Sequence, residues 1–135
     1  MRNIFAKYLN IPYKSKGRDF SGVDCYGLLL LIFKEEKNII LPDYTENKEL
    51  REWYHTKDVH VLDNIAKLWR PVKNEEFKVF DVHNFLDEHH ILSHVGINIG
   101  DFKFLHVLDD RFTEIGKIDV WAKRLVFTMR YVGDA

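Results

Sequence analysis

The sequence has a single cysteine, almost no net charge and no long apolar run. One cysteine in 135 residues excludes a disulfide scaffold and a zinc site built from several thiolates. The formal net charge of −1 gives no reason to expect binding to nucleic acid or to an anionic membrane surface. The longest apolar run, residues 28–33, is far too short to span a bilayer. We therefore expect neither a nucleic-acid partner nor a membrane anchor.

The first residues also lack the features of a secretory signal. Residues 1–8 carry positive charge, but no apolar segment follows them. We expect a protein made in the cytoplasm; if it acts outside the cell, something other than a signal peptide carries it there. Internal repeats and low-complexity stretches are missing too. The length fits one domain, which we place over residues 1–135.

The pattern of apolar residues predicts helices in the first half of the chain and strands in the second. The predicted helices cover residues 1–10, 24–37, 45–56 and 58–69, with a loop over 13–23 and a turn at 41–43. The predicted strands cover residues 79–85, 91–99, 103–108, 112–118 and 125–132, with a hairpin turn at 100–101. Helices followed by an antiparallel sheet predict an α+β fold.

Cys25 lies at the start of the helix predicted over residues 24–37. That helix is apolar on all sides, so we expect it to be buried at the centre of the fold. The positive end of a helix stabilises a thiolate, and we therefore expect a lowered pKa for this thiol. Judged alone, however, a single cysteine is more often a small buried side chain than a nucleophile.

Two histidines lie on the two strands of the predicted hairpin. His94 and His106 are an even number of residues apart, so their side chains are expected to share a face and to lie opposite or nearly opposite each other. A papain-like site needs a cysteine at a helix N-terminus, a histidine that exchanges protons with it, and a third polar group that fixes the tautomer of the histidine. The pair suits a base and its orienting residue. It also fits a two-histidine metal site, and either histidine alone is commonly structural.

Several motifs resemble, in order and spacing, those of the NlpC-type cell-wall cysteine peptidases. They are Tyr13-Lys14-Ser15-Lys16-Gly17, Gly22-Val23-Asp24-Cys25-Tyr26-Gly27, Leu41-Pro42, Ser93-His94-Val95-Gly96-Ile97 and Phe104-Leu105-His106. The resemblance covers residues 8–108. It implies a papain-like NlpC-type fold, in which the helix that carries the nucleophile packs on a C-terminal antiparallel sheet or half-barrel.

The resemblance also implies roles for individual residues. Cys25 would be the nucleophile, His94 the general base and His106 the orienting residue, with no metal and no cofactor. Tyr13 would lie near the nucleophile and help to bind the oxyanion. The implied substrate is a peptidoglycan stem peptide, cut between D-glutamate and a diamino acid. The candidate substrate-binding residues are Lys14, Arg18, Asp24 and Ser93.

Two features of the sequence suggest a particular branch of the family. Tyr26 stands where Ser follows the nucleophile in most members, and Gly17-Arg18-Asp19 lies upstream. These features resemble the branch found among phage tail proteins, so we expect association with a virion tail or delivery to the cell wall, and other tail proteins as partners. Two alternatives stay open: a structural or assembly component of a tail tip with weak or no hydrolysis, and an enzyme that uses the same residues for acyl transfer or on another amide.

Overall fold

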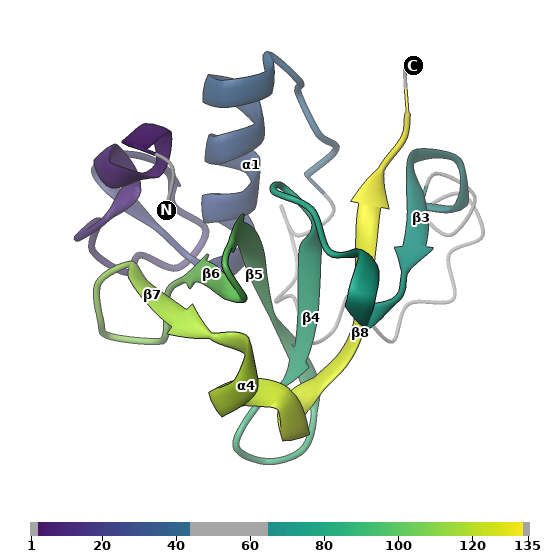
Figure 1. Cartoon of the computed structure of the whole chain (residues 1–135). Coiled ribbons are helices and arrows are strands. Elements are labelled where there is room, and N and C mark those ends of the chain that lie inside the picture. Colours follow the sequence, from purple (N-terminus) through teal and green to yellow (C-terminus); the bar gives the residue numbers. More distant parts are fainter. Residues whose placement is uncertain (1–2, 44–64, 134–135) are drawn as a thin grey trace.

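The computed structural model describes residues 3–43 and 65–133 and shows helix α1 lying over an antiparallel sheet (Figure 1). The elements before the sheet are η1 (Asn3–Tyr8), β1 (Arg18–Asp19), β2 (Gly22–Val23) and α1 (Cys25–Lys37). Those that follow are β3 (Trp69–Val72), η2 (Asn74–Glu76), β4 (Val82–Leu86), β5 (Leu92–Gly100), β6 (Lys103–His106), β7 (Glu114–Lys117), α4 (Ile118–Trp121), η3 (Ala122–Arg124) and β8 (Leu125–Tyr131).

The main sheet contains six strands in the order β3-β8-β4-β5-β6-β7, and every pair is antiparallel. Strands β1 and β2 form a separate small hairpin just ahead of α1. One helix packed on an antiparallel sheet confirms the predicted α+β class. Within residues 3–43 and 65–133, no helix is both long and apolar enough to cross a membrane.

The two faces of the main sheet carry different side chains. Alternate residues of β5 point to opposite faces, and those that join the large apolar cluster with α1 are Val95, Ile97 and Ile99. His94 lies on the other face. There Phe85 and Phe104 form a second, smaller cluster with Ile118 of α4. Figure 1 shows α1 at the top of the view and α4 at the bottom, with β5 and β6 between them.

Helix α1 begins where Asp24 can cap it. The Asp24 carboxylate accepts a hydrogen bond of 2.7 Å from the backbone N–H of Gly27, one of the donors that a helix leaves unpaired at its start. The helix ends at Asn38, which adopts the left-handed conformation common at this position. The helix predicted over residues 24–37 is confirmed, with Asp24 as its cap. Its buried residues are Tyr26, Gly27, Leu28, Leu29, Leu31, Ile32 and Phe33.

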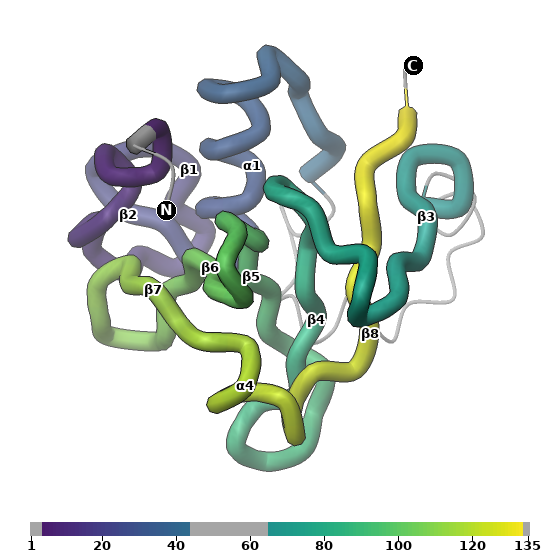
Figure 2. Tube along the Cα trace, in the orientation of Figure 1, coloured from purple at the N-terminus to yellow at the C-terminus, as the bar shows by residue number. Residues whose placement is uncertain are grey.

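The segment between η1 and α1 is hydrogen-bonded to the residues just before β7, the edge strand of the main sheet. The backbone N–H of Tyr13 donates to the Arg111 carbonyl at 2.8 Å, and the N–H of Thr113 donates to the Ile11 carbonyl at 2.8 Å. Figure 2 shows this N-terminal segment beside the loop that precedes β7. These bonds bring Tyr13 and Arg111 to the same side of the molecule as the first turn of α1.

The predicted hairpin is confirmed, but its turn lies one residue further on. The β5–β6 register pairs Gly100 with Lys103, so the two turn residues are Asp101 and Phe102. Both have positive φ, 55° and 56°, as a two-residue hairpin turn that matches strand twist requires.

Other predictions need correction. The loop expected over 13–23 contains the β1–β2 hairpin, and no turn forms at residues 41–43. Residues 65–68 are helical as expected, but Trp69 starts β3, and the predictions for residues 45–64 lie outside the described residues.

The strand expected from Val79 begins at Val82, because the Asp81 carboxylate accepts a hydrogen bond from the Lys78 N–H and closes a turn there. The strand expected over 112–118 spans 114–117, and the one over 125–132 is confirmed as β8.

Gly27 gives a direct test of how tightly the first turn of α1 packs. A Cβ at this position would lie 1.9 Å from the Gly17 carbonyl oxygen, which is backbone and cannot swing away. Helix propensity alone favours alanine by about 1 kcal/mol, but we expect Gly27→Ala to lower the free energy of unfolding by about 3 kcal/mol through overpacking. Urea unfolding at 25 °C measures the change.

The matched control is Lys34→Ala, an exposed position on the same helix, where a change within about 0.5 kcal/mol is expected. A Gly27→Ala protein as stable as the parent would contradict this packing.

Candidate active site

The site forms where strand β5 continues beyond the end of β6. The paired register of these strands stops at Ile97 and Leu105, and β6 itself ends at His106. Among the described residues, the β5 segment from Ser93 to Val95 therefore has no β6 neighbour, and its backbone on that side is open. The first residue of α1, Cys25, enters this opening.

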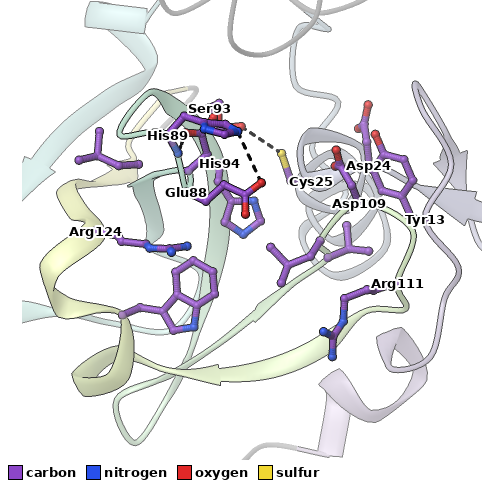
Figure 3. Close-up of a pocket in the computed structure, with 15 residues that line it drawn as sticks. Tyr13, Asp24, Cys25, Glu88, His89, Ser93, His94, Asp109, Arg111 and Arg124 are labelled. Carbon is purple, nitrogen blue, oxygen red and sulfur yellow. Dashed lines mark hydrogen bonds and ion pairs between the residues drawn. The ribbon is translucent and has the colours of Figure 1, made fainter.

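The Cys25 sulfur lies against the backbone on either side of His94. Its thiol donates to the Ser93 carbonyl oxygen at an Sγ–O distance of 3.9 Å. The backbone N–H of Val95 donates to the same sulfur. Figure 3 shows the Ser93 contact as a dashed line that crosses the top of the pocket. No hydrogen bond joins Cys25 to the His94 ring in the described part of the chain, so in this resting arrangement the thiol proton is held by a backbone carbonyl.

The expected lowering of the Cys25 pKa is wrong for this state. Burial of the sulfur raises the pKa of the thiol, with help from the negative charges of Asp24 and Asp109. Hydrogen bonds from the backbone N–H groups of Val95 and Tyr26 act in the opposite direction and are outweighed. The raised pKa keeps the thiol neutral. The residue as a whole is only partly buried and lines the pocket, so the thiol is also accessible from there.

His94 and His106 form the hydrogen-bonded pair that the sequence suggested. The β5–β6 register places them on one face as diagonal neighbours. His94 Nε2 and His106 Nδ1 are 2.9 Å apart. His94 Nδ1 has no hydrogen-bond partner among the described residues, although the side chain is 7% exposed. A buried ring nitrogen without a hydrogen-bond partner is energetically unfavourable. The ring that carries it lines the same pocket as Cys25.

Both imidazoles are held neutral. The pKa of His94 is lowered to about 3, chiefly by burial and then by electrostatic interactions with His106 and Arg124. Burial also lowers the pKa of His106 to about 4, with a smaller contribution from Arg111. A neutral imidazole with one bare nitrogen is the form that can accept a proton.

Cys25 and His94 line a cavity of about 640 Å³ with charged residues on both sides. Figure 3 shows Tyr13, Asp24 and Asp109 beside Cys25, and Glu88, His89 and Arg124 across the pocket. Arg111 lies below them in the same view. A substrate with both ammonium and carboxylate groups can therefore find a partner of opposite charge near the sulfur.

The structure brings together most of the residues singled out from the sequence. Tyr13, Asp24, Cys25, Ser93 and His94 all line the cavity, and His106 lies behind His94. Asp24 is also engaged within the fold, because its carboxylate caps α1 and accepts a bond of 2.9 Å from Arg18 Nη1.

Two predicted substrate-binding residues lie outside the lining of this cavity. Lys14 does not contribute to it. Arg18 does not line it either, and its guanidinium bonds to Asp24 and to Asp43, the latter at 2.8 Å. The role of both residues in binding a substrate stays a prediction.

Sequence reasoning missed the lining residues that come from the last third of the chain. Trp121 and Arg124 belong to α4 and η3, two short helices for which no prediction was made. Asp109 and Arg111 follow His106 in a connecting segment. The signal that was available is their closeness in sequence to His106, which places them near any site built on that residue. No cluster of three or more His, Cys, Asp or Glu side chains suited to a metal ion occurs within residues 3–43 and 65–133.

A sequence model of the NlpC/P60 family matches residues 10–130 of the chain. Among solved structures, the NlpC/p60 domain of the peptidoglycan hydrolase SagA aligns with a TM-score of 0.63 and 20% identity, over 92% of this chain and 90% of that one. No curated protein sequence matches the chain.

Two longer proteins align equally well over part of their length. A Bacillus cereus NlpC/P60 family protein gives a TM-score of 0.65 and 21% identity, over 92% of this chain and 36% of that one. A Staphylococcus aureus protein described as similar to a lipoprotein of the NLP/P60 family gives 0.64 and 20%, over 95% and 39%. The chain thus spans little more than a third of these two proteins. At these identities the alignments show a shared fold.

The neutral histidines predict how stability changes in acid. In the unfolded chain an imidazole titrates near ~6.5, whereas His94 and His106 titrate at about 3 and about 4 in the fold. Below ~6.5 the unfolded state therefore binds protons that the folded state does not, and the free energy of unfolding falls as the pH drops from ~6.5 towards those two values. Above ~6.5 this contribution is fully retained.

Urea midpoints measured from about pH 7.5 to about pH 4.5 follow this loss. His106→Gln should give a shallower fall, because one of the two titrating rings is gone. His89→Gln, which changes an exposed imidazole, should leave the fall unchanged. Identical pH dependence for the parent and His106→Gln would contradict the account.

Proposed function

The chain belongs to the NlpC/P60 family, and from this premise we propose that it is a cysteine peptidase that hydrolyses amide bonds in peptidoglycan stem peptides. SagA, whose domain has the same fold, is a peptidoglycan hydrolase. The observation that carries the proposal is the arrangement of His94. Its Nε2 is bonded to His106 while its Nδ1 is bare, and it shares a pocket with the only thiol of the chain.

The proposed reaction begins from a neutral thiol and a neutral imidazole. When a substrate carbonyl enters the pocket, the thiol turns from the Ser93 carbonyl, passes its proton to His94 Nδ1 and attacks the amide carbon. His94 Nε2 lies 2.9 Å from His106 Nδ1, and we assign the proton to Nε2, so that it donates to His106; this bond fixes the tautomer and stabilises the imidazolium that forms. His94 then gives the proton to the leaving amine, and water hydrolyses the thioester with His94 as base.

Two groups are suited to bind the oxyanion. The backbone N–H of Cys25 belongs to the first turn of α1, where donors have no partner within the helix. The Tyr13 side chain lines the pocket beside Cys25 and is the second candidate. Donors that are already in place cost no reorganisation as charge develops on the oxygen.

The charges of the pocket support a bond between D-glutamate and a diamino acid. Such a substrate carries carboxylates and an amino group close to the scissile amide. We assign a substrate carboxylate to Arg111 or Arg124 and an amino group to Asp24 or Asp109, all of which line the pocket. The carbonyl of Ser93 contacts the Cys25 sulfur, which places Ser93 next to the reacting group. Lys14 and Arg18 are candidates for contacts with parts of the substrate that extend beyond the pocket.

We propose, in addition, action at a phage or prophage tail. Tyr26 replaces the serine that most members carry after the nucleophile. Here it is buried to 7% exposure and its hydroxyl donates to the Pro42 carbonyl at 2.8 Å. Tyr26 therefore connects α1 to the segment before residue 44 and does not line the pocket. We interpret it as a packing feature that distinguishes one branch of the family.

One observation favours a second candidate, a structural component of a tail tip with weak or no hydrolysis. The Cys25 thiol is neutral and bonded to a backbone carbonyl, which is also how an inert buried cysteine behaves. Incubation of the wild-type chain with a panel of stem-peptide fragments separates the two candidates. Release of a new amine supports the hydrolase, and intact fragments support the structural role. Acyl donors in the same panel would reveal transfer in place of hydrolysis.

The central test is to replace the two reacting groups. Cys25→Ala removes the nucleophile and His94→Ala removes the base, so each should lower the turnover of a stem peptide by at least about 10²–10⁴-fold. Amine release followed by chromatography measures the rate.

His90→Asn is the matched control, since His90 is exposed, lies outside the cavity lining and has a positive φ that asparagine tolerates. Equal urea midpoints verify that the variants are folded. Wild-type turnover in Cys25→Ala or in His94→Ala would show that the assignment is wrong.

A further inference from the structure

Trp121 stacks, with an offset, against the imidazole of the proposed base. The ring centroids of Trp121 and His94 are 5.7 Å apart and their planes meet at 28°, an offset-stacked arrangement. The same indole meets His106 edge-on, at 5.0 Å and 86°. One side chain from the last third of the chain therefore contacts both members of the histidine pair.

The fold holds Trp121 in this position through the short segment that carries it. Helix α4 follows β7 directly, and its first residue, Ile118, is buried and donates its backbone N–H to the Phe102 carbonyl at 2.8 Å. The indole then packs against the aromatic ring of Phe85, at 5.4 Å, and that of Phe104, at 5.9 Å. Trp121 is half-buried, with the rest of its surface lining the pocket.

His94 needs such a partner because one hydrogen bond does not fix a ring. The bond to His106 holds Nε2 in place, but rotation about that contact would still carry Nδ1 away from the pocket. Stacking against a flat indole removes this rotation. Phe85, on the neighbouring strand, also contacts His94, at 5.9 Å and with a larger interplanar angle of 39°.

We infer that Trp121 is the positioning residue of the site: its indole holds the plane of the His94 ring so that Nδ1 stays directed into the pocket, and it shields the ring from water. Because the role concerns the proposed base, the inference rests on the proposed function. Trp121 acts through His94 and is not itself a reacting group.

The charges around His94 agree with this role. Burial is the largest cause of its lowered pKa, and Trp121 supplies part of that burial. Arg124 lies over the indole ring, with its guanidinium carbon 5.3 Å from the ring centroid, and its charge is another cause of the lowered pKa of His94. Among the described residues, the other ionisable groups that face His94 or line its pocket are Tyr13, Asp24, Cys25, Asp87, Glu88, His89, His106, Asp109 and Arg111.

Two variants distinguish the effect of the flat ring of Trp121 from the effect of its bulk, and a third serves as the control. Trp121→Phe keeps an aromatic plane, whereas Trp121→Leu keeps apolar bulk without one. Val120→Ala is the matched control, because it changes an exposed side chain of the same helix that does not line the pocket. Each protein is compared with the parent in kcat and KM for a stem peptide, and in the pH dependence of kcat/KM.

Trp121→Leu should lower kcat at least about tenfold, since misplacing a base by a fraction of an ångström has effects of this order, while KM changes less than about twofold. The acid limb of its pH profile should move up by at least about one unit towards ~6.5, because the ring is less buried. Trp121→Phe should recover most of both effects. Unchanged kcat and pH profile in Trp121→Leu, or equal shifts in Val120→Ala, would overturn the inference.

A second readout does not depend on hydrolysis. The rate at which iodoacetamide alkylates Cys25 should show an inflection where His94 titrates, and this inflection should move to higher pH in Trp121→Leu but not in Val120→Ala. An inactive parent with the inflection in place would refute the proposed function and leave the role of Trp121 supported. An active parent whose inflection is the same in every variant would refute the role of Trp121 alone.

Discussion

The early end of the β5–β6 ladder is the constraint on which the site depends. Because β6 stops at His106, the backbone of β5 from Ser93 to Val95 is open on one side, and the first turn of α1 can bring the Cys25 sulfur against it. His106, as the last residue of β6, still shares a face with His94 and bonds to it. Had the ladder continued for two more residues, the thiol would have met a closed sheet. The close approach of Gly27 to Gly17 and the Asp24 cap then fix the helix in this opening.

Burial decides the protonation states. A helix N-terminus favours a thiolate by a modest amount, on the order of 1 kcal/mol at an exposed site, whereas taking a charge out of water costs more. The thiol and both imidazoles are therefore neutral in the resting structure. In the proposed reaction the thiolate is therefore made at the moment of attack, by transfer of the thiol proton to the neighbouring ring, rather than stored as an ion pair. The rings and apolar residues that exclude water from the histidines are then part of the proposed chemistry.

The sequence allowed prediction of the α+β class, the helix from Asp24 to Lys37, the hairpin and the pairing of His94 with His106, because each depends on local periodicity or on a short turn. It did not predict β3, the β1–β2 hairpin or the α4–η3 segment that carries Trp121. A two-residue strand and a four-residue helix have too little periodicity to be recognised, and they form here because tertiary contacts hold them. The pKa of Cys25 was predicted with the wrong sign, since the depth of the sulfur is set by strands far away in the sequence.

The central claim concerns the tautomer of His94, that is, which of its two ring nitrogens carries the proton. A ¹H–¹⁵N correlation spectrum of the histidine side chains, recorded near neutral pH and assigned with a His94→Gln variant, reports the tautomer directly. We predict a neutral ring with the proton on Nε2, donated to His106 Nδ1, and an unprotonated Nδ1 facing the thiol. A His94 ring that carries its proton on Nδ1, or that is charged at neutral pH, would contradict the account.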